Sequence, residues 1–82
     1  MIVFSKHALE QMRERGASEE DVRRAIGEGE QFPAKHGRMG YRLNLPFNAQ
    51  WGDKQYASKQ VAPIVAIESS DQIVVTVYVF YF

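Results

Sequence analysis

Residues 5–29 read SKHALEQMRERGASEEDVRRAIGEG, and this stretch sets the fold class. It predicts two short helices joined by a two-residue link. Ser5 begins the first helix as an N-cap, because its hydroxyl can accept a hydrogen bond from free backbone N–H groups of the first turn. Gly16 ends that helix in the left-handed conformation that glycine readily adopts. Ser18 and Asp21 form a capping-box-like pair at the start of the second helix. The stretch therefore predicts a helical hairpin.

The chain on either side of the hairpin predicts strands. Residues 2–4 are a short apolar run that predicts an opening strand. Residues 38–48, RMGYRLNLPFN, alternate apolar and polar side chains, which is typical of a half-buried strand. Residues 61–67 and 73–82 are nearly all apolar, and they predict two central strands.

The remaining segments complete the predicted order. Gly27 and Gly29 are expected to stop the second helix. Residues 49–59 are polar and predict a loop or a weak strand, and a further short strand is allowed near residues 31–36. We therefore expect residues 1–82 to form a single α+β domain of order β-α-α-β-β-β. Its N-terminal strand and helical hairpin would pack on one face of a three- to five-stranded antiparallel sheet.

The charge is balanced overall but unevenly placed along the chain. Ten Lys and Arg residues balance ten Asp and Glu residues, and the formal net charge is zero. Residues 31–66 hold five of the cations and only one anion, Asp53, so a local positive field is expected. Domains dedicated to nucleic acid are usually basic overall, so neutrality argues against tight nucleic-acid binding.

The composition excludes several kinds of site. Without cysteine the chain has no disulfide, no thiolate zinc site and no cysteine nucleophile. Its two histidines lie far apart without clustered ligands, so we expect no metal site and no cofactor. The N-terminus has no signal-peptide pattern. The longest apolar run, residues 73–82, is about half of what a membrane helix needs. We therefore expect a cytoplasmic protein that does not contact a membrane.

His7 and Arg15 are the candidate functional residues of the first helix. His7 falls in the first turn, where the positive end of the helix dipole opposes a charged imidazole. A neutral imidazole can act as a general base, and the same position equally suits a solvated surface histidine. Arg15 is either a site cation or a surface residue that pairs with neighbouring glutamates.

A second group of candidates lies on the alternating strand and beyond it. Arg38, Arg42 and Asn44 share the polar face of that strand. Arginine binds phosphate through two parallel hydrogen bonds, and asparagine adds a neutral donor. Trp51 suits stacking of unpaired bases, and Lys59 adds a cation further on. The alternative is an ordinary polar sheet face with its loop aromatics folded back onto the core.

The last predicted strand supplies a further candidate and a candidate interface. Thr76 and Tyr78 lie on one face of it. A tyrosine hydroxyl can take part in proton transfer if its pKa is lowered, although such a ring more commonly packs in the core with its hydroxyl in water. The strand is apolar on both faces, and the helices cover only one. The other face suggests a homodimer or a protein partner.

Three segments carry a resemblance to a known family: SKHALEQMRERGASEEDV at 5–22, HGRMGYR at 36–42 and DQIVVTVY at 71–78. Together they resemble a small bacterial family of unknown function, which is similar to the RelE/ParE/BrnT-type toxin superfamily. That superfamily places two helices against an antiparallel sheet. Many of its members are ribonucleases that cut messenger RNA with basic residues on the sheet and without a metal. This chain has Gln11 where the family often has an arginine.

The resemblance implies functional residues and partners without assigning a unique mechanism. His7 and Arg15 match the family's histidine and its Arg-Gly position, and Arg38 matches its Gly-Arg. RNA cleavage needs a base, an acid and cations for the phosphate. His7 or His36, Tyr41 or Tyr78, and Arg38 with Arg42 can fill these roles.

Two main functions therefore stay open, beside a third, which is weak binding of RNA or DNA without cleavage. The first is a toxin-like domain that acts as a metal-independent ribonuclease, with RNA as its substrate and a cognate antitoxin as its partner. The second is a non-catalytic interaction module on the same fold, which dimerises or binds a protein through the C-terminal strand.

Overall fold

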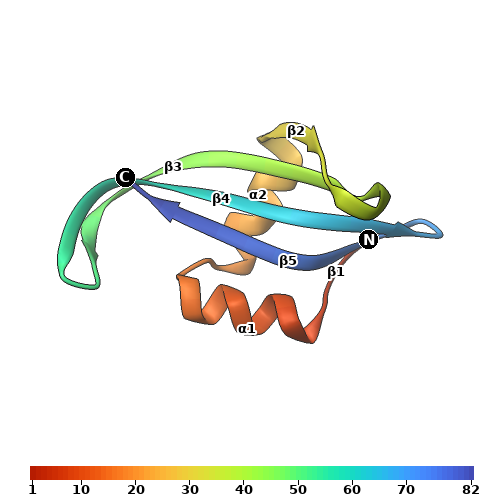
Figure 1. The fold of residues 1–82 in the computed structure, drawn as a ribbon, viewed down its shortest axis with the longest axis horizontal. Helices are drawn as coiled ribbons and strands as arrows, with labels where there is room; N and C mark the ends of the chain where they lie inside the picture. The colour runs from red at the N-terminus through yellow and green to blue at the C-terminus, as the bar shows by residue number, and fades with distance from the viewer.

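The computed structural model describes all residues 1–82. Its strands form one mixed sheet (Figure 1). The spatial order of its five strands is β1-β5-β4-β3-β2. The elements along the chain are β1 (Ile2–Phe4), α1 (Lys6–Arg15), α2 (Glu19–Glu28), β2 (Glu30–Pro33), the 3₁₀ turn η1 (Lys35–Gly37), β3 (Met39–Trp51), β4 (Lys54–Glu68) and β5 (Asp71–Tyr81). The predicted α+β class and element order are confirmed, and β2 is the additional short strand.

Helix α1 begins and ends where the sequence predicts. The Ser5 hydroxyl accepts a hydrogen bond from the backbone N–H of Ala8 at 3.0 Å, which makes Ser5 the N-cap. Gly16 closes the helix with φ of 81°, in the left-handed region that favours glycine. Its N–H donates to the carbonyl of Met12 at 2.9 Å. Local chemistry alone therefore accounts for both ends of α1.

Helix α2 follows the prediction at its start and runs further at its end. Both hydrogen bonds of the capping box between Ser18 and Asp21 are present. The predicted stop at Gly27 was wrong, because the helix continues through it. A glycine in an exposed last turn weakens a helix by only about 1 kcal/mol. Gly29 is the actual C-cap, and its N–H donates to the carbonyl of Ala25 at 2.8 Å.

The sheet differs from the expected fully antiparallel sheet in one pairing. Strands β2 to β5 pair antiparallel with their neighbours, whereas β1 runs parallel to β5, with Ile2 opposite Gln72. A parallel pair requires a long crossover connection. Here the rest of the chain, including both helices, provides that connection. The first and last strands are therefore neighbours.

Of the two alternatives predicted for residues 49–59, a loop or a weak strand, the structure shows strand on both sides of a short turn. These residues form the end of a long β3–β4 hairpin, which turns between Trp51 and Lys54 with Gly52 at φ of 66°. Aromatic packing explains its order. The ring of Trp51 stacks on Tyr81 with centroids 4.8 Å apart, and Tyr56 lies 5.8 Å from the same ring.

The core lies between the helices and one face of the sheet. Figure 1 shows α1 along β5 and α2 across β3 and β4, on the same side. The buried cluster combines residues of both helices with those of β3, β4 and β5: Ala8, Met12, Ala17, Val22, Ala25, Tyr41, Leu45, Val61, Val65, Val74 and Val77. No helix covers the opposite face, which we call the open face. Neither helix has the length and apolarity needed to cross a membrane.

Candidate functional site

A pocket of about 360 Å³ lies on the open face, between the turn η1 and strands β4 and β5. We call it the η1 pocket. Its lining residues are Ala34, Lys35, His36, Arg38, Ile64, Thr76 and Tyr78. Its volume lies at the lower end of the roughly 300–1,000 Å³ that is usual for small-molecule sites. Polar groups with several chemistries converge here, so the pocket is the main candidate site.

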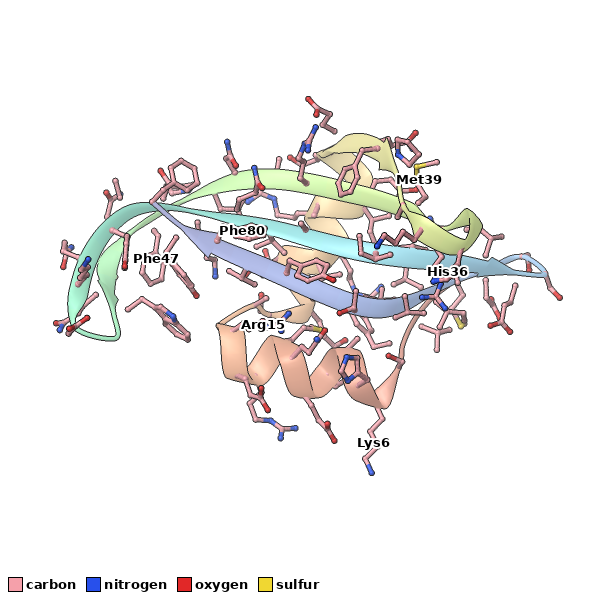
Figure 2. All side chains as sticks on the ribbon, viewed as in Figure 1. Lys6, Arg15, His36, Met39, Phe47 and Phe80 are labelled. Carbon is pink, nitrogen blue, oxygen red and sulfur yellow. The ribbon has the colours of Figure 1, made fainter.

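The turn η1 holds the cationic side of the pocket in an unusual backbone conformation. His36 has φ of 63° and Gly37 has φ of 69°, so two successive residues are left-handed. Backbone hydrogen bonds close the turn, from Ala34 N–H to the Arg38 carbonyl at 3.0 Å and from Arg38 N–H to the Lys35 carbonyl at 3.3 Å. A left-handed histidine costs about 1–3 kcal/mol, and such strain clusters at functional sites. Figure 2 shows His36 at this turn.

The two cations of the pocket have no acidic partner. Lys35 and Arg38 are exposed and take part in no ion pair, in contrast to Arg42, which pairs with Glu30. An unpaired cation keeps its full attraction for an incoming anion. Beside His36, these two side chains make the η1 side of the pocket suited to a phosphate group.

Strand β5 forms the opposite wall, and α1 supports that wall from behind. Tyr78 and Thr76 face the pocket two residues apart on the strand. Arg15 donates from Nη1 to the Val77 carbonyl at 2.8 Å, and its guanidinium lies 5.6 Å from the centre of the Tyr78 ring. Arg15 does not line the pocket. It contacts Tyr78 and the β5 backbone, and so can position Tyr78.

Gln11 makes the second contact between α1 and β5. Its Oε1 accepts from the Val77 backbone N–H at 3.0 Å and also from the Thr76 hydroxyl. Because a backbone N–H can only donate, the amide oxygen of Gln11 must face it. Gln11 therefore satisfies the Val77 N–H on the free edge of β5 and contacts a residue of the pocket wall.

Arg42 and Asn44 share the open face but lie outside the η1 pocket. Arg42 donates from Nε to Glu30 at 2.8 Å, and its guanidinium lies 4.8 Å from the centre of the Phe32 ring. Asn44 Oδ1 accepts from Gln60 at 2.9 Å. The predicted constellation of Arg38, Arg42 and Asn44 is therefore split, because only Arg38 reaches the pocket.

Lys59 and Trp51 lie at the far end of the sheet, where β3 and β4 extend past the helices. Lys59 Nζ donates to the Gly16 carbonyl at 2.8 Å and to Asp21 at 2.9 Å, and its side chain is only 13% exposed. Trp51 is stacked on Tyr81, whose hydroxyl donates to the Arg15 carbonyl at 2.6 Å. Both proposed nucleic-acid residues therefore make structural contacts that hold the hairpin to the helices.

The titration of this end follows from its packing. Burial raises the pKa of Asp21, but the hydrogen bonds from Lys59 and from the Ser18 backbone outweigh burial, so the pKa lies below its ordinary value. Burial, and then the negative charge of Asp21, raises the pKa of the Tyr81 hydroxyl. The lowered pKa favours an ionised Asp21, which pairs with Lys59, and the raised pKa favours a neutral Tyr81, which donates its hydroxyl proton to the Arg15 carbonyl.

His7 lies on the exposed side of α1 and does not line the η1 pocket. Tyr41 is 6% exposed in the core, which leaves Tyr78 as the tyrosine that faces the open side. No cluster of three or more His, Asp and Glu side chains is placed to hold a metal ion. Of the alternatives left open by the sequence, the pocket thus brings together His36, Tyr78 and Arg38.

Comparison with known proteins places the chain in a family. A family model, described as a domain of unknown function (DUF4258), matches residues 4–79. The chain belongs to this family. A search of curated proteins and a search of solved structures gave no match. The DUF4258 match spans α1, η1 and most of β5, so it includes every element that builds the η1 pocket.

Sequence reasoning missed Lys35 and Thr76 as pocket residues. The only signal for Lys35 was its position beside His36 and Gly37, a pair that suits a tight left-handed turn. For Thr76 the signal was its shared face with Tyr78. No local sequence pattern indicated that η1 would lie next to β5, because β4 separates β5 from β3, the strand that follows η1.

Proposed function

We propose that this DUF4258 domain binds single-stranded RNA at the η1 pocket and cleaves it without a metal, as a toxin-like ribonuclease similar in fold to the RelE/ParE/BrnT-type superfamily. The observation that carries the proposal is the convergence of His36, Arg38 and Tyr78 in one pocket of about 360 Å³. An imidazole, a phenol and a guanidinium can supply the base, the acid and the positive charge that phosphodiester cleavage needs.

The reaction assigns one role to each group. The His36 imidazole takes the proton of a ribose 2′-hydroxyl, whose oxygen then forms a bond to the adjacent phosphorus. The bond from phosphorus to the 5′-oxygen breaks, and the Tyr78 hydroxyl gives its proton to that leaving oxygen. The products are a 2′,3′-cyclic phosphate and a 5′-hydroxyl end. Arg38 and Lys35 stabilise the negative charge that develops on the phosphate.

The surroundings of the pocket support an RNA strand as its ligand. Tyr78 and Phe80 are 46% and 54% exposed, and their rings lie 6.4 Å apart on the open face. Exposed aromatic rings beside cations provide stacking surfaces for unpaired bases. Two unpaired cations and neutral overall charge predict binding that is weak and only modestly salt-dependent.

The test is cleavage of a labelled RNA by purified protein at low salt, in the presence of a chelator. His36→Ala is expected to slow cleavage by about 100-fold or more, as for loss of a general base. His7→Ala is the matched control, since it removes the other exposed histidine, and it should cleave at the wild-type rate. Intact RNA with the wild-type protein would reject the enzymatic proposal. Equal losses in both variants would reject His36 as the sole base.

A cognate antitoxin belongs to the same proposal. If the domain cleaves messenger RNA, its expression should arrest growth, and a partner encoded beside it should relieve the arrest. The His36→Ala variant should not arrest growth at equal expression. Growth arrest by that variant would show that toxicity does not depend on RNA cleavage by His36.

A second function is favoured by one observation, the aromatic surface of β5. Tyr78, Phe80 and Phe82 are 46%, 54% and 57% exposed. Contiguous apolar surface of this kind is common at protein interfaces. On this proposal the domain is a non-catalytic module that dimerises or binds a protein through β5. Analytical ultracentrifugation at micromolar concentration, with Phe80→Ser as the variant, tests the homodimer. A wild-type monomer would reject it.

A further inference from the structure

The Thr76 hydroxyl has a fixed hydrogen-bonding direction. Gln11 Oε1 accepts from the Val77 backbone N–H at 3.0 Å, so the amide oxygen faces Thr76 as well. That oxygen can only accept, so the Thr76 hydroxyl must give it its single proton. The hydroxyl oxygen keeps its lone pairs, and Thr76 lines the η1 pocket. Toward a ligand, Thr76 is therefore an acceptor and not a donor.

The η1 pocket consequently has two chemically different sides. On the η1 side, Lys35 and Arg38 are donors that carry positive charge and have no acidic partner. On the β5 side, Thr76 offers only lone pairs. An anionic oxygen is attracted to the first side and is repelled by the Thr76 oxygen, because acceptors do not bind one another. A phosphate alone therefore leaves the Thr76 oxygen without a donor.

We infer that Thr76 reads a neutral hydrogen-bond donor of the bound RNA, next to the phosphate held by Lys35 and Arg38. This inference rests on the proposed function, since it names the recognition group of that same site. RNA offers two such donors within one nucleotide of a phosphate, the ribose 2′-hydroxyl and a base amino or imino group. The 2′-hydroxyl of the scissile bond is excluded, because its one proton goes to His36. The donor therefore belongs to a flanking ribose or to a base.

Tyr78 explains why the donor comes within reach of Thr76. The two residues lie two positions apart on one face of β5, a separation of about 7 Å along the strand. A base stacked on the exposed Tyr78 ring brings its own edge and its ribose beside the neighbouring residue of that face. Gln11 acts as a positioning residue, because it fixes the direction of the Thr76 hydroxyl without touching the ligand.

The experiment is a thermodynamic cycle on binding affinity. A fluorescent single-stranded RNA and a 2′-O-methyl strand of the same sequence are titrated with wild-type protein, Thr76→Val and Thr76→Ser. Low salt and 4 °C are used, with strand integrity checked on a gel. The 2′-O-methyl strand keeps the base groups but has no ribose donor. Thr76→Val, of similar shape, should bind RNA about fivefold more weakly, the usual value of one neutral hydrogen bond. Thr76→Ser keeps the hydroxyl and should bind like wild type.

The 2′-O-methyl strand identifies the donor. If the Thr76→Val penalty disappears on that strand, the donor is a ribose hydroxyl, and if the penalty persists, the donor is on the base. Equal RNA affinity of Thr76→Val and wild type would overturn the inference and leave the proposed function standing. Absence of RNA binding by the wild-type protein would overturn both, and circular dichroism of each variant confirms that it is folded.

Discussion

The two ends of the sheet use the same kind of residue in opposite ways. At the hairpin end, Lys59 is 13% exposed and is bound to both Asp21 and the Gly16 carbonyl. At the η1 end, Lys35 and Arg38 are exposed and bound to no acid. All three cations come from the same positive segment of the chain. Availability for a ligand therefore depends on whether the fold brings a partner within reach, and local charge density does not reveal this.

The largest expected effect tests how tightly the hairpin end is packed. Gly16→Ala should destabilise the fold by about 3 kcal/mol, combining a disfavoured left-handed alanine with overpacking. Gly16 has φ of 81°, and an added Cβ would lie 2.5 Å from the Tyr81 hydroxyl and 2.9 Å from the Trp51 ring. Urea unfolding measures the change. Gly27→Ala is the matched control, because that Cβ meets open space inside α2, and it should stabilise by about 0.5–1 kcal/mol.

The second effect tests Lys59 as a structural cation. Lys59→Met should cost about 2 kcal/mol of unfolding free energy, because it leaves the half-buried Asp21 carboxylate without its partner. The control Lys54→Met removes an exposed lysine from the hairpin turn and should change stability by less than about 0.5 kcal/mol. RNA affinity per folded molecule should not change in either variant. A weaker affinity for RNA in Lys59→Met alone would assign Lys59 a binding role as well.

The third effect tests the opposite end. Replacing both Lys35 and Arg38 with glutamine should weaken RNA binding about tenfold at low salt and reduce the salt-dependence slope by about 1.4, which corresponds to two phosphate contacts on a single strand. Stability should stay within about 0.5 kcal/mol of wild type, since neither residue is paired. The control replaces Arg23 and Arg24 of α2. If the control weakens binding equally, the η1 cations have no special role.

The pH dependence of stability is a further test of the packing at the hairpin end. The pKa of Asp21 is lower in the folded state than in the unfolded chain, so its contribution to stability is present above about pH 4 and is lost as the pH falls below that value. Thermal unfolding between pH 6 and pH 2.5 should therefore show a smaller acid loss in Asp21→Asn than in wild type. A parallel decline in the two proteins would show that Asp21 does not carry this dependence.

The smallest effect concerns Arg42, which is intermediate between the two ends. Its ion pair with Glu30 is exposed, so Arg42→Gln should change stability by no more than about 0.5 kcal/mol. RNA affinity should fall by less than twofold, since Arg42 lies outside the η1 pocket. If Arg42→Gln weakens binding as much as Arg38→Gln does, the RNA site extends along β3.

The helices could be predicted from the sequence because their ends depend on neighbouring residues. The Ser5 cap, the Gly16 terminus and the Ser18 capping box all act within one turn. The strands were predicted where side chains alternate or are continuously apolar. Residues 49–59 were left open between a loop and a weak strand, because Trp51 and Tyr56 are ordered by Tyr81, which is distant in the sequence.

The candidate site was predictable only in part, for the same reason. Arg38 and Tyr78 were proposed from the face they occupy, and both line the pocket. Lys59 and Trp51 were proposed on similar chemical grounds, but they lie at the hairpin end of the sheet. There Lys59 contacts the α1–α2 turn and Trp51 packs on Tyr81 of β5. Thr76 gains its fixed direction from Gln11, 65 residues away in the chain. Such long-range contacts have no local signature.

The parallel pairing of β1 with β5 affects the order in which the protein folds. Ile2 lies opposite Gln72, so β1 and β5 come together across about 70 residues of intervening chain. Contacts between residues so distant in sequence form late and slow folding. The same last strand supplies Thr76 and Tyr78 to the pocket. Before β5 joins the sheet, the cations of η1 therefore face no opposite wall, so the pocket forms late in folding.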